Sequence, residues 1–418
     1  MIQLGALIVL VLLTDLGGRA SRAVRMPRVI GVMFTGVAVG IALTVLGGEL
    51  PLGPLLADEG LLQGAATLGI VLFMVALGHH LRAPVAAAVA GAEGMRPSPA
   101  RVLGAVGLVT GVPFVVGVAA AVVTYEAWAG EGVAFPAYAV MHGCLFTLTA
   151  VPVLQRVLAE YGLADTRLGR FALTQSLITD VAVWGLVTVI VGLHASGDPR
   201  TAVVSLGMLL GVVILLCRAW EMLCARTSAG AGSRAVSLVL LVVVVAQVGE
   251  VFGQSTLVMG LAVGACLRHD PGTADVVATV ARLNLRTLFP LFFVQIGLTL
   301  DGWSVGGPGL PLVVVGAVMA VAYGSKWVAS WAGARVYGMR PDAGAAATLL
   351  SLRGATELAL AVALYEGGLV NAAGLTALIV FAVVSTLVAV LCSMPLRRRS
   401  SQVEEPATAD VAAVGATG

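Results

Sequence analysis

Charged residues are scarce in this sequence. Asp, Glu, Lys and Arg make up only 11% of its 418 residues, whereas a soluble domain carries roughly 25%. A globule of this size cannot cover its surface with so few polar side chains, and 59% of the residues are hydrophobic. The composition therefore excludes an ordinary soluble protein and predicts a chain that lies in a lipid bilayer.

The chain also lacks the groupings that mark enzymes and nucleic-acid-binding proteins. Its five cysteines are scattered through apolar stretches, which predicts inert thiols and no zinc site. No nucleophile–base pair, metal-ligand spacing or phosphate loop is visible, so we expect neither an enzyme nor a cofactor. The basic residues are dispersed and the net charge is only +2, which indicates no nucleic-acid partner.

Apolar runs long enough to cross a bilayer are abundant. Thirteen candidate spans lie near residues 2–16, 29–46, 63–78, 102–123, 134–157, 168–193, 201–216, 236–250, 254–267, 287–300, 311–334, 343–364 and 372–394. We predict an all-α polytopic membrane protein of about 13 transmembrane helices. Its transmembrane domain covers 1–399, and 400–418 form a disordered tail without an apolar pattern.

The positions of the basic residues support this count. The loops after odd-numbered spans, together with the tail, hold 21 of the 24 Lys and Arg residues, and the other loops hold only Arg200. The positive-inside rule then places the C-terminus in the cytoplasm and the N-terminus outside, in the plasma membrane. A single span over 236–267 would put Arg234 and Arg268 on opposite faces. Two short spans joined near Gly253 are therefore expected.

Four charged residues lie deep inside predicted spans, away from the span ends: Asp180, Lys326, Arg353 and Glu357. A charge at the bilayer centre costs from a few to more than about ten kcal/mol, so such residues usually pair or line a cavity. Lys326 is the only lysine of the chain. It either neutralises Asp180 when no cation is bound, or pairs with a helix-end carbonyl or an acid as part of a scaffold.

Asp180 lies about halfway along the span 168–193. Burial disfavours the charged form of a carboxylate, so an acid in this setting can take up either a proton or a metal cation. Thr179 and Thr174 offer neutral oxygens, which hard cations prefer. The structural alternative is an aspartate that only holds helices together by hydrogen bonds.

Two spans carry residues that interrupt helices. In 134–157, Pro152 removes a backbone donor, and together with Thr147 and Thr149 it favours local unwinding. Carbonyls freed at such a break can bind a cation, although an ordinary proline kink is the alternative.

The second interrupted span is 343–364. Arg353 and Glu357 are four residues apart there, on one helix face where they can pair, and Gly354 permits a break between them. The pair either stabilises an unwound crossing near a substrate site or is purely structural.

Five segments, in this order, resemble the monovalent cation:proton antiporter family 2 of the sodium/hydrogen exchanger-like superfamily. They are VRMPRVIGVMFTGVAVG, LGIVLFMVALGHHL, TAVPVLQRVLAEYGLADTRLGR with LITDVAVW, LFPLFFVQIGLTLD, and SLRGATELALAVAL. The resemblance covers roughly residues 5–394. It implies inverted repeats in which spans 5 and 12 are broken helices that cross at the midplane, a mobile core, and a dimerisation domain that makes a homodimer.

The resemblance also implies roles for single residues. Asp180 falls on the family's ion- and proton-binding aspartate, and Lys326 falls on a basic residue that faces it. Arg353 and Glu357 fall on the second broken helix. The family often has Asp-Asp or Asn-Asp where this chain has Thr179-Asp180, and the missing acid favours one-for-one exchange.

These observations predict a secondary active antiporter that exchanges Na⁺ or K⁺ for protons by alternating access. Asp180 is the expected shared site for the proton and the transported cation. The supporting residues are Thr179, Thr149 and Thr147 as ligands, Lys326, Arg353 and Glu357 for charge compensation, and Pro152 and Gly354 at the helix breaks. The alternatives are a same-fold exporter or symporter of a small organic solute, and a non-transporting membrane sensor or assembly factor.

Overall fold

The computed structural model describes residues 2–23, 26–46, 59–90, 98–227, 230–252, 254–300 and 311–403. Within these ranges the chain is helical, and one isolated β-bridge joins Ala129 and Val370. The helices are α1 (Ile2–Ala23), α2 (Arg28–Leu46), α4 (Glu59–Ala90), α5 (Pro99–Val106), the π-helical turn η1 (Gly107–Gly111), α6 (Val112–Trp128), α7 (Phe135–Thr147), α8 (Val151–Glu160), α9 (Arg167–Ser196), α10 (Pro199–Arg226), α11 (Ala231–Val251), α12 (Thr256–Cys266), α13 (Pro271–Asn284), α14 (Phe289–Thr299), α15 (Leu312–Tyr337), α16 (Ala343–Leu350), α17 (Ala355–Glu366) and α18 (Ala372–Val403).

Every predicted span coincides with a helix or with an interrupted pair of helices, which confirms the all-α membrane fold. By length and composition alone, ten segments of the described chain can cross a membrane, or eleven with the bent pair α13–α14. The count of thirteen also needs α12 and the pair α7–α8, whose helices are too short to qualify singly. The predicted junction at Gly253 lies outside the described residues, between α11 and α12. Helix α18 runs past residue 400 to Val403, and 404–418 lie outside the described residues.

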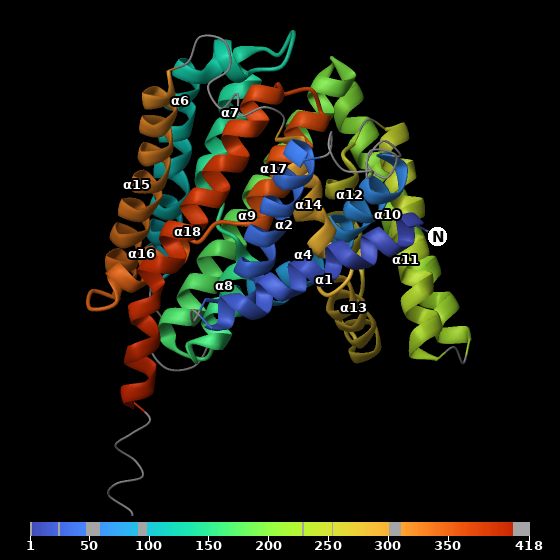
Figure 1. Ribbon diagram of the computed structural model, residues 1–418, viewed down its shortest axis with the longest axis horizontal. Helices are drawn as coiled ribbons and strands as arrows, with labels where there is room; N and C mark the ends of the chain where they lie inside the picture. The colour runs from blue at the N-terminus through green and yellow to red at the C-terminus, as the bar shows by residue number, and fades with distance from the viewer. Residues whose placement is uncertain are drawn as a thin grey trace, which may run out of the picture.

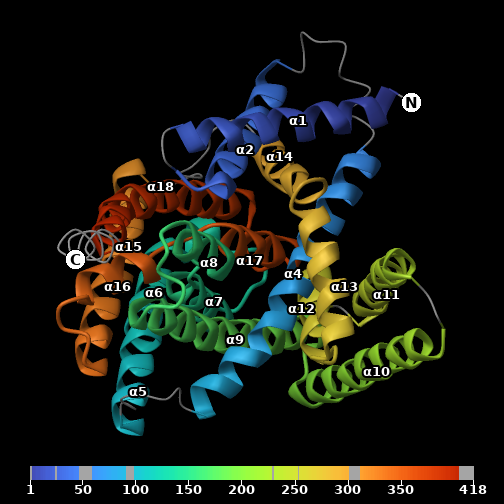
Figure 2. The same ribbon diagram turned by 90° about the horizontal axis from the view of Figure 1, so that it is seen from below.

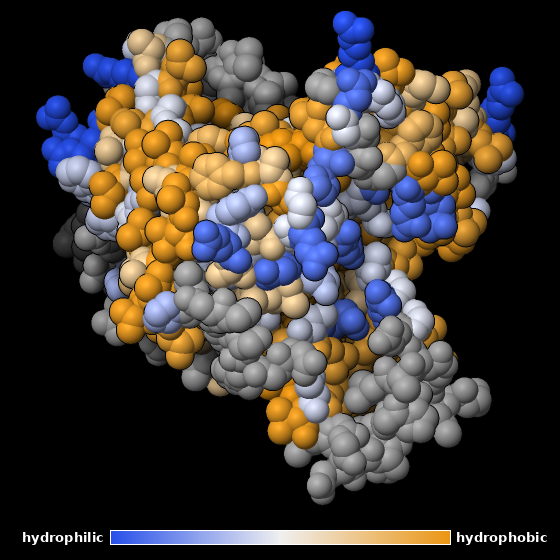
Figure 3. Space-filling view, turned by 90° about the horizontal axis from the view of Figure 1, so that it is seen from above, coloured by the Kyte–Doolittle hydropathy of each residue, from blue (hydrophilic) through white to orange (hydrophobic). Residues whose placement is uncertain are grey.

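The surface has the polarity expected of a protein in lipid. Large apolar side chains are exposed on the outer helices, among them Leu103 on α5, Leu215 on α10 and Val313 on α15. Figure 3 looks onto one end of the helices and shows hydrophobic flanks with hydrophilic residues gathered over the middle. Apolar flanks of this extent indicate contact with lipid rather than with water.

The helices form two bundles, which are seen together in Figures 1 and 2. The core bundle consists of α5 to α9, including η1, and α15 to α18; the scaffold bundle consists of α1, α2, α4 and α10 to α14. In the scaffold, α4 packs on α12 and α14, and α2 packs on α1 and α14. In the core, α6 packs on α7 and α15 packs on α16. The bundles meet where α9 contacts α4 and α10 and where α8 contacts α2.

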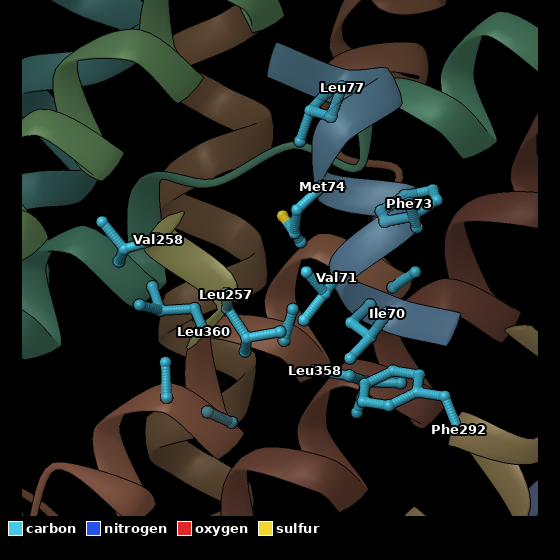
Figure 4. Packing of buried hydrophobic residues seen from close by; sticks show 14 of the residues in the cluster. Ile70, Val71, Phe73, Met74, Leu77, Leu257, Val258, Phe292, Leu358 and Leu360 are labelled. Atoms are coloured by element: carbon cyan, nitrogen blue, oxygen red, sulfur yellow. The ribbon is translucent and has the colours of Figure 1, made fainter. Parts of the chain in front are cut away.

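Part of the boundary between the bundles is purely apolar. Figure 4 shows Leu358 and Leu360 of α17 in one cluster with Val71 and Met74 of α4 and with Leu257 of α12. All of these side chains are buried. Apolar contacts are not directional, so close packing alone holds this part of the boundary.

Backbone-to-backbone contact holds the scaffold together. At the crossing of α2 and α14, a Cβ atom on Gly40 would lie 2.2 Å from the Val294 carbonyl oxygen. A Cβ atom on Gly297 would lie 2.3 Å from the Val37 carbonyl oxygen. Only glycine permits helices in a membrane to approach so closely.

We expect Gly297→Ala to destabilise the protein by roughly 1–3 kcal/mol, because the added methyl group forces α2 and α14 apart. The measurement is the midpoint of thermal unfolding in detergent. Gly211→Ala on α10 is the matched control, since nothing lies within 4 Å of its Cβ position. Equal midpoints for the two variants would show that the close crossing contributes nothing to stability.

Candidate functional site

The first predicted break lies between α7 and α8. Helix α7 ends at Thr147 and α8 begins at Val151, so three residues of extended or irregular backbone separate them. Pro152 occupies the first turn of α8, where its missing N–H leaves no helical hydrogen bond unmade. The interruption predicted from Pro152 is therefore confirmed as a true break and not a kink.

The second break separates α16, which ends at Leu350, from α17, which begins at Ala355. Gly354 precedes α17 with φ of +154°, a value that other residues rarely adopt. A Cβ atom at Gly354 would also lie 3.0 Å from Val153 Cγ2 of α8. The glycine thus permits both the turn of the chain and the approach of α8.

The two breaks cross and are hydrogen-bonded to each other. Ala150 N donates to the Leu352 carbonyl at 2.8 Å, and Thr149 Oγ1 donates to the Leu350 carbonyl at 2.8 Å. In Figure 1, α7–α8 runs from the top toward the bottom of the molecule, whereas α16–α17 runs upward. The crossed arrangement expected for spans 5 and 12 is therefore present in the core bundle.

Two buried cations satisfy the carbonyls at the end of α7. Arg353 Nη1 donates to the Leu145 carbonyl at 3.0 Å, and Nη2 donates to the Phe146 carbonyl at 2.9 Å. Lys326 Nζ donates to the Thr147 carbonyl at 2.6 Å. The last carbonyls of a helix have no partner within it and carry partial negative charge, so cations stabilise this end.

Arg353 also forms the predicted ion pair with Glu357, in the first turn of α17. Its guanidinium lies over the Phe381 ring, with Cζ 4.6 Å from the ring centroid. Both members of the pair are buried. The pairing inferred from their spacing is confirmed, and its partners join α17 to the end of α7.

Asp180 is completely buried on α9, and neither of its carboxylate oxygens has a hydrogen-bond partner within the described chain. Lys326 is close enough for the two charges to interact, but these two side chains form no direct ion pair. Thr179 Oγ1 lies 2.9 Å from Thr110 Oγ1. A carboxyl group whose two oxygens have no hydrogen-bond partner can bind either a proton or a cation, here beside a buried ammonium group.

The predicted threonines have different surroundings. Thr147 Oγ1 donates to the Gly143 carbonyl of its own helix at 2.7 Å, and Thr149 is part of the contact between the breaks. Thr174 is half-buried and stands six residues, about 9 Å, before Asp180 along the helix. Thr179 is thus the predicted threonine that directly adjoins Asp180.

Some residues around the site escaped the sequence analysis. Ser176 is buried one helical turn before Asp180, and the i, i+4 spacing was the signal for it. Gln175 Oε1 and Ser330 Oγ are buried and have no hydrogen-bond partner in the described chain. The turn η1, which contains Thr110, was also missed. Its only sequence signal is the pair of glycines at its two ends, Gly107 and Gly111, shortly before Pro113.

A family model described as "Sodium/hydrogen exchanger, transmembrane" matches residues 6–397. The chain belongs to this family. The chain is 26% identical over 286 residues to the Na⁺/H⁺ antiporter NhaS4 of a Synechocystis strain, covering 66% of this chain and 70% of that protein. It is 25% identical over 317 residues to Cation/H⁺ antiporter 18 of Arabidopsis thaliana, covering 72% of this chain but only 37% of the plant protein.

The fold of this chain matches a solved structure. The sodium proton antiporter MjNhaP1 from Methanocaldococcus jannaschii, determined at pH 8, superposes with a TM-score of 0.58 and 14% identity. The match covers 95% of this chain and 98% of that one. The predicted resemblance to the exchanger-like superfamily is confirmed, and so is the membrane setting.

We expect Arg353→Ala to lower the stability of the protein by about 3–5 kcal/mol, because it leaves Glu357 buried without a partner. The double variant Arg353→Ala/Glu357→Ala should lose less than the sum of the two single losses, measured by thermal unfolding in detergent. Arg156→Ala, in the exposed Arg156–Glu160 pair, is the control and should cost less than about 1 kcal/mol. Strict additivity at the buried pair would contradict the coupling.

Proposed function

We propose that this exchanger is a cation:proton antiporter that moves a monovalent cation, Na⁺ or K⁺, against protons. Membership of the sodium/hydrogen exchanger family supports this proposal. The relatives reported above carry the names of Na⁺/H⁺ and cation/H⁺ antiporters. The N-terminus outside, the C-terminus in the cytoplasm and a homodimeric assembly belong to the same proposal.

The observation that carries the proposal is the state of Asp180. It is buried in the core bundle, and neither of its carboxylate oxygens has a hydrogen-bond partner in the described chain. A buried acid with hydrogen-bond partners on other helices would have a structural role. Asp180 has no such partner in the described chain. A proton and a cation that compete for one carboxylate cannot occupy it together, and this competition couples their fluxes.

The bundles supply a route for alternating access. Asp180, Lys326 and both helix breaks belong to the core bundle, and the scaffold faces α17 through the apolar cluster around Leu360 and Met74. A rigid movement of the core along that boundary breaks no ion pair within the cluster. Such a movement would open Asp180 to one side of the membrane and then to the other.

The exchange we propose is one cation for one proton. Thr179 stands where a second acid would add a second exchangeable proton. Lys326 Nζ donates to two carbonyl oxygens, those of Val109 and Thr147, which favours a lysine that stays charged through the cycle. Asp180 is then the one group at the site that exchanges a bound proton for a bound cation.

Asp180→Asn is expected to reduce cation-dependent proton movement to the level of vesicles that lack the protein, because an amide takes up neither a proton nor a cation in exchange. The measurement is dye quenching in everted vesicles, titrated with Na⁺ and K⁺ across pH. Asp198→Asn is the matched control, since Asp198 caps α10 at an exposed site and asparagine caps equally well.

Wild-type exchange by the Asp180→Asn protein would refute the proposed site. Transport of an organic solute that survives this substitution would favour an exporter or symporter on the same fold. No flux from the wild-type protein with either cation would favour a membrane sensor.

Proteoliposomes driven by a cation gradient are expected to exchange ions without sustained current on a solid-supported membrane. An imposed membrane potential should leave the rate unchanged. Thr179→Asp adds a second carboxylate beside Asp180, and this variant should make the rate depend on potential. A sustained current from the wild-type protein would rule out one-for-one exchange.

A further inference from the structure

A π-helical turn, η1, lies between α5 and α6 and contacts the residues of the candidate site. Helices α5 and α6 are continuous through η1, and residues Gly107–Gly111 form the wider turn. A π turn inserts an extra residue and disturbs the usual carbonyl partners, and such turns are frequent at functional sites. This turn holds Val109, which is buried, and Thr110, which is half-buried.

Pro113 explains why a carbonyl is available in this turn. In a regular α-helix the N–H of residue 113 would donate to the carbonyl of Val109, four residues earlier. Proline has no N–H, so this bond cannot form. The Val109 carbonyl instead accepts Lys326 Nζ at 3.2 Å. One proline thus creates a docking point for the only lysine of the chain.

Three helices that carry the candidate site converge on this turn. Lys326 of α15 binds the Val109 carbonyl. Thr147, at the end of α7, places Oγ1 3.4 Å from the Thr110 carbonyl oxygen. Thr179 of α9 shares a hydrogen bond of 2.9 Å with the Thr110 hydroxyl. Helix α15 and helix α7 both pack on η1 along the backbone as well.

The bond between Thr110 and Thr179 has a consequence for cation binding. A hydroxyl group binds a metal cation through an oxygen lone pair, so its hydrogen must point to another acceptor. The Thr110 oxygen, 2.9 Å from Thr179 Oγ1, can accept that hydrogen. Thr179 can then direct its lone pairs toward a cation on Asp180. A proton on Asp180 needs no such arrangement.

We propose that Thr110, held in the π turn, is a positioning residue that sets the affinity of the Asp180 site for the cation relative to the proton. This inference rests on the proposed function, in which Asp180 exchanges the two. Thr110 acts through Thr179, and the same turn fixes Lys326 on the Val109 carbonyl. The ammonium group is thereby kept from closing on Asp180, whose oxygens stay open.

The test is Thr110→Val, which removes the hydroxyl and keeps the shape. We expect the apparent affinity for the transported cation to fall about three- to tenfold, the effect of one lost hydrogen bond. Since cation and proton compete, the pH for half-maximal exchange at a fixed cation concentration should move upward. Both quantities are midpoints of titration curves, so they do not depend on how much of the protein folds. Thr110→Ser should restore both.

Two further comparisons isolate the contact. Thr179→Val should lower the cation affinity at least as much as Thr110→Val, because it removes the proposed cation ligand together with the bond. The double variant should be little worse than Thr179→Val alone, since Thr110 acts through Thr179. Thr188→Val is the matched control on α9, since its hydroxyl donates only to the Trp184 carbonyl of its own helix at 2.7 Å. Its affinity and pH profile should equal those of the wild type.

Pro113→Ala provides a second route to the same turn. It returns an N–H that competes with Lys326 for the Val109 carbonyl, so cation affinity should again fall.

The outcomes separate the two proposals. If wild-type protein exchanges ions and Asp180→Asn does not, but Thr110→Val keeps the wild-type affinity and pH profile, the role of Thr110 is overturned. Additive losses in the double variant would overturn it as well. If the wild type moves no cation against protons, the proposed function itself fails.

Discussion

The end of α7 inside the core bundle is the constraint on which the site depends. Lipid offers no water to a freed carbonyl, so a helix that stops within the membrane needs donors from its own protein. Arg353 supplies them to Leu145 and Phe146, and Lys326 supplies one to Thr147. These bonds bring α15 and the second broken helix to the first. The crossing is therefore held by cations on carbonyls and by hydrogen bonds between the breaks.

Lys326 and Arg353 both donate to backbone carbonyls, and the two buried acids near them differ in their contacts. Glu357 pairs with Arg353, whereas Asp180 keeps both oxygens open and meets the charge of Lys326 without a direct pair. Under the proposed mechanism, the site with protonated Asp180 and charged Lys326 has one positive charge. It has the same net charge when ionised Asp180 holds a monovalent cation. Under that mechanism, replacing the proton by the cation leaves the charge of the moving site unchanged, so a complete cycle moves no net charge across the membrane.

Much of this arrangement was predictable from the sequence, because the bilayer imposes simple rules. Apolar runs located the helices, the breakers at Pro152 and Gly354 located both interruptions, and the i, i+4 spacing predicted the Arg353–Glu357 pair. Lys326 remained ambiguous, since its partners are carbonyls 217 and 179 positions away in the sequence. The π turn was missed because periodicity changes little over five residues. The number of spans was harder to predict, since α12 is apolar but has only 11 residues, fewer than a membrane-crossing helix needs.

The two bundles are held together by different kinds of contact, and this difference indicates where motion is possible. Scaffold helices touch backbone to backbone at Gly40 and Gly297, where any shift brings main-chain atoms into collision. Helix α17 meets the scaffold through the buried apolar side chains of Leu358 and Leu360, and these contacts include no directional bond. The breaks of the core, by contrast, are fixed by directional bonds to Lys326 and Arg353. Under the proposed alternating access, displacement would follow the apolar boundary, and the site would move with the core as one unit.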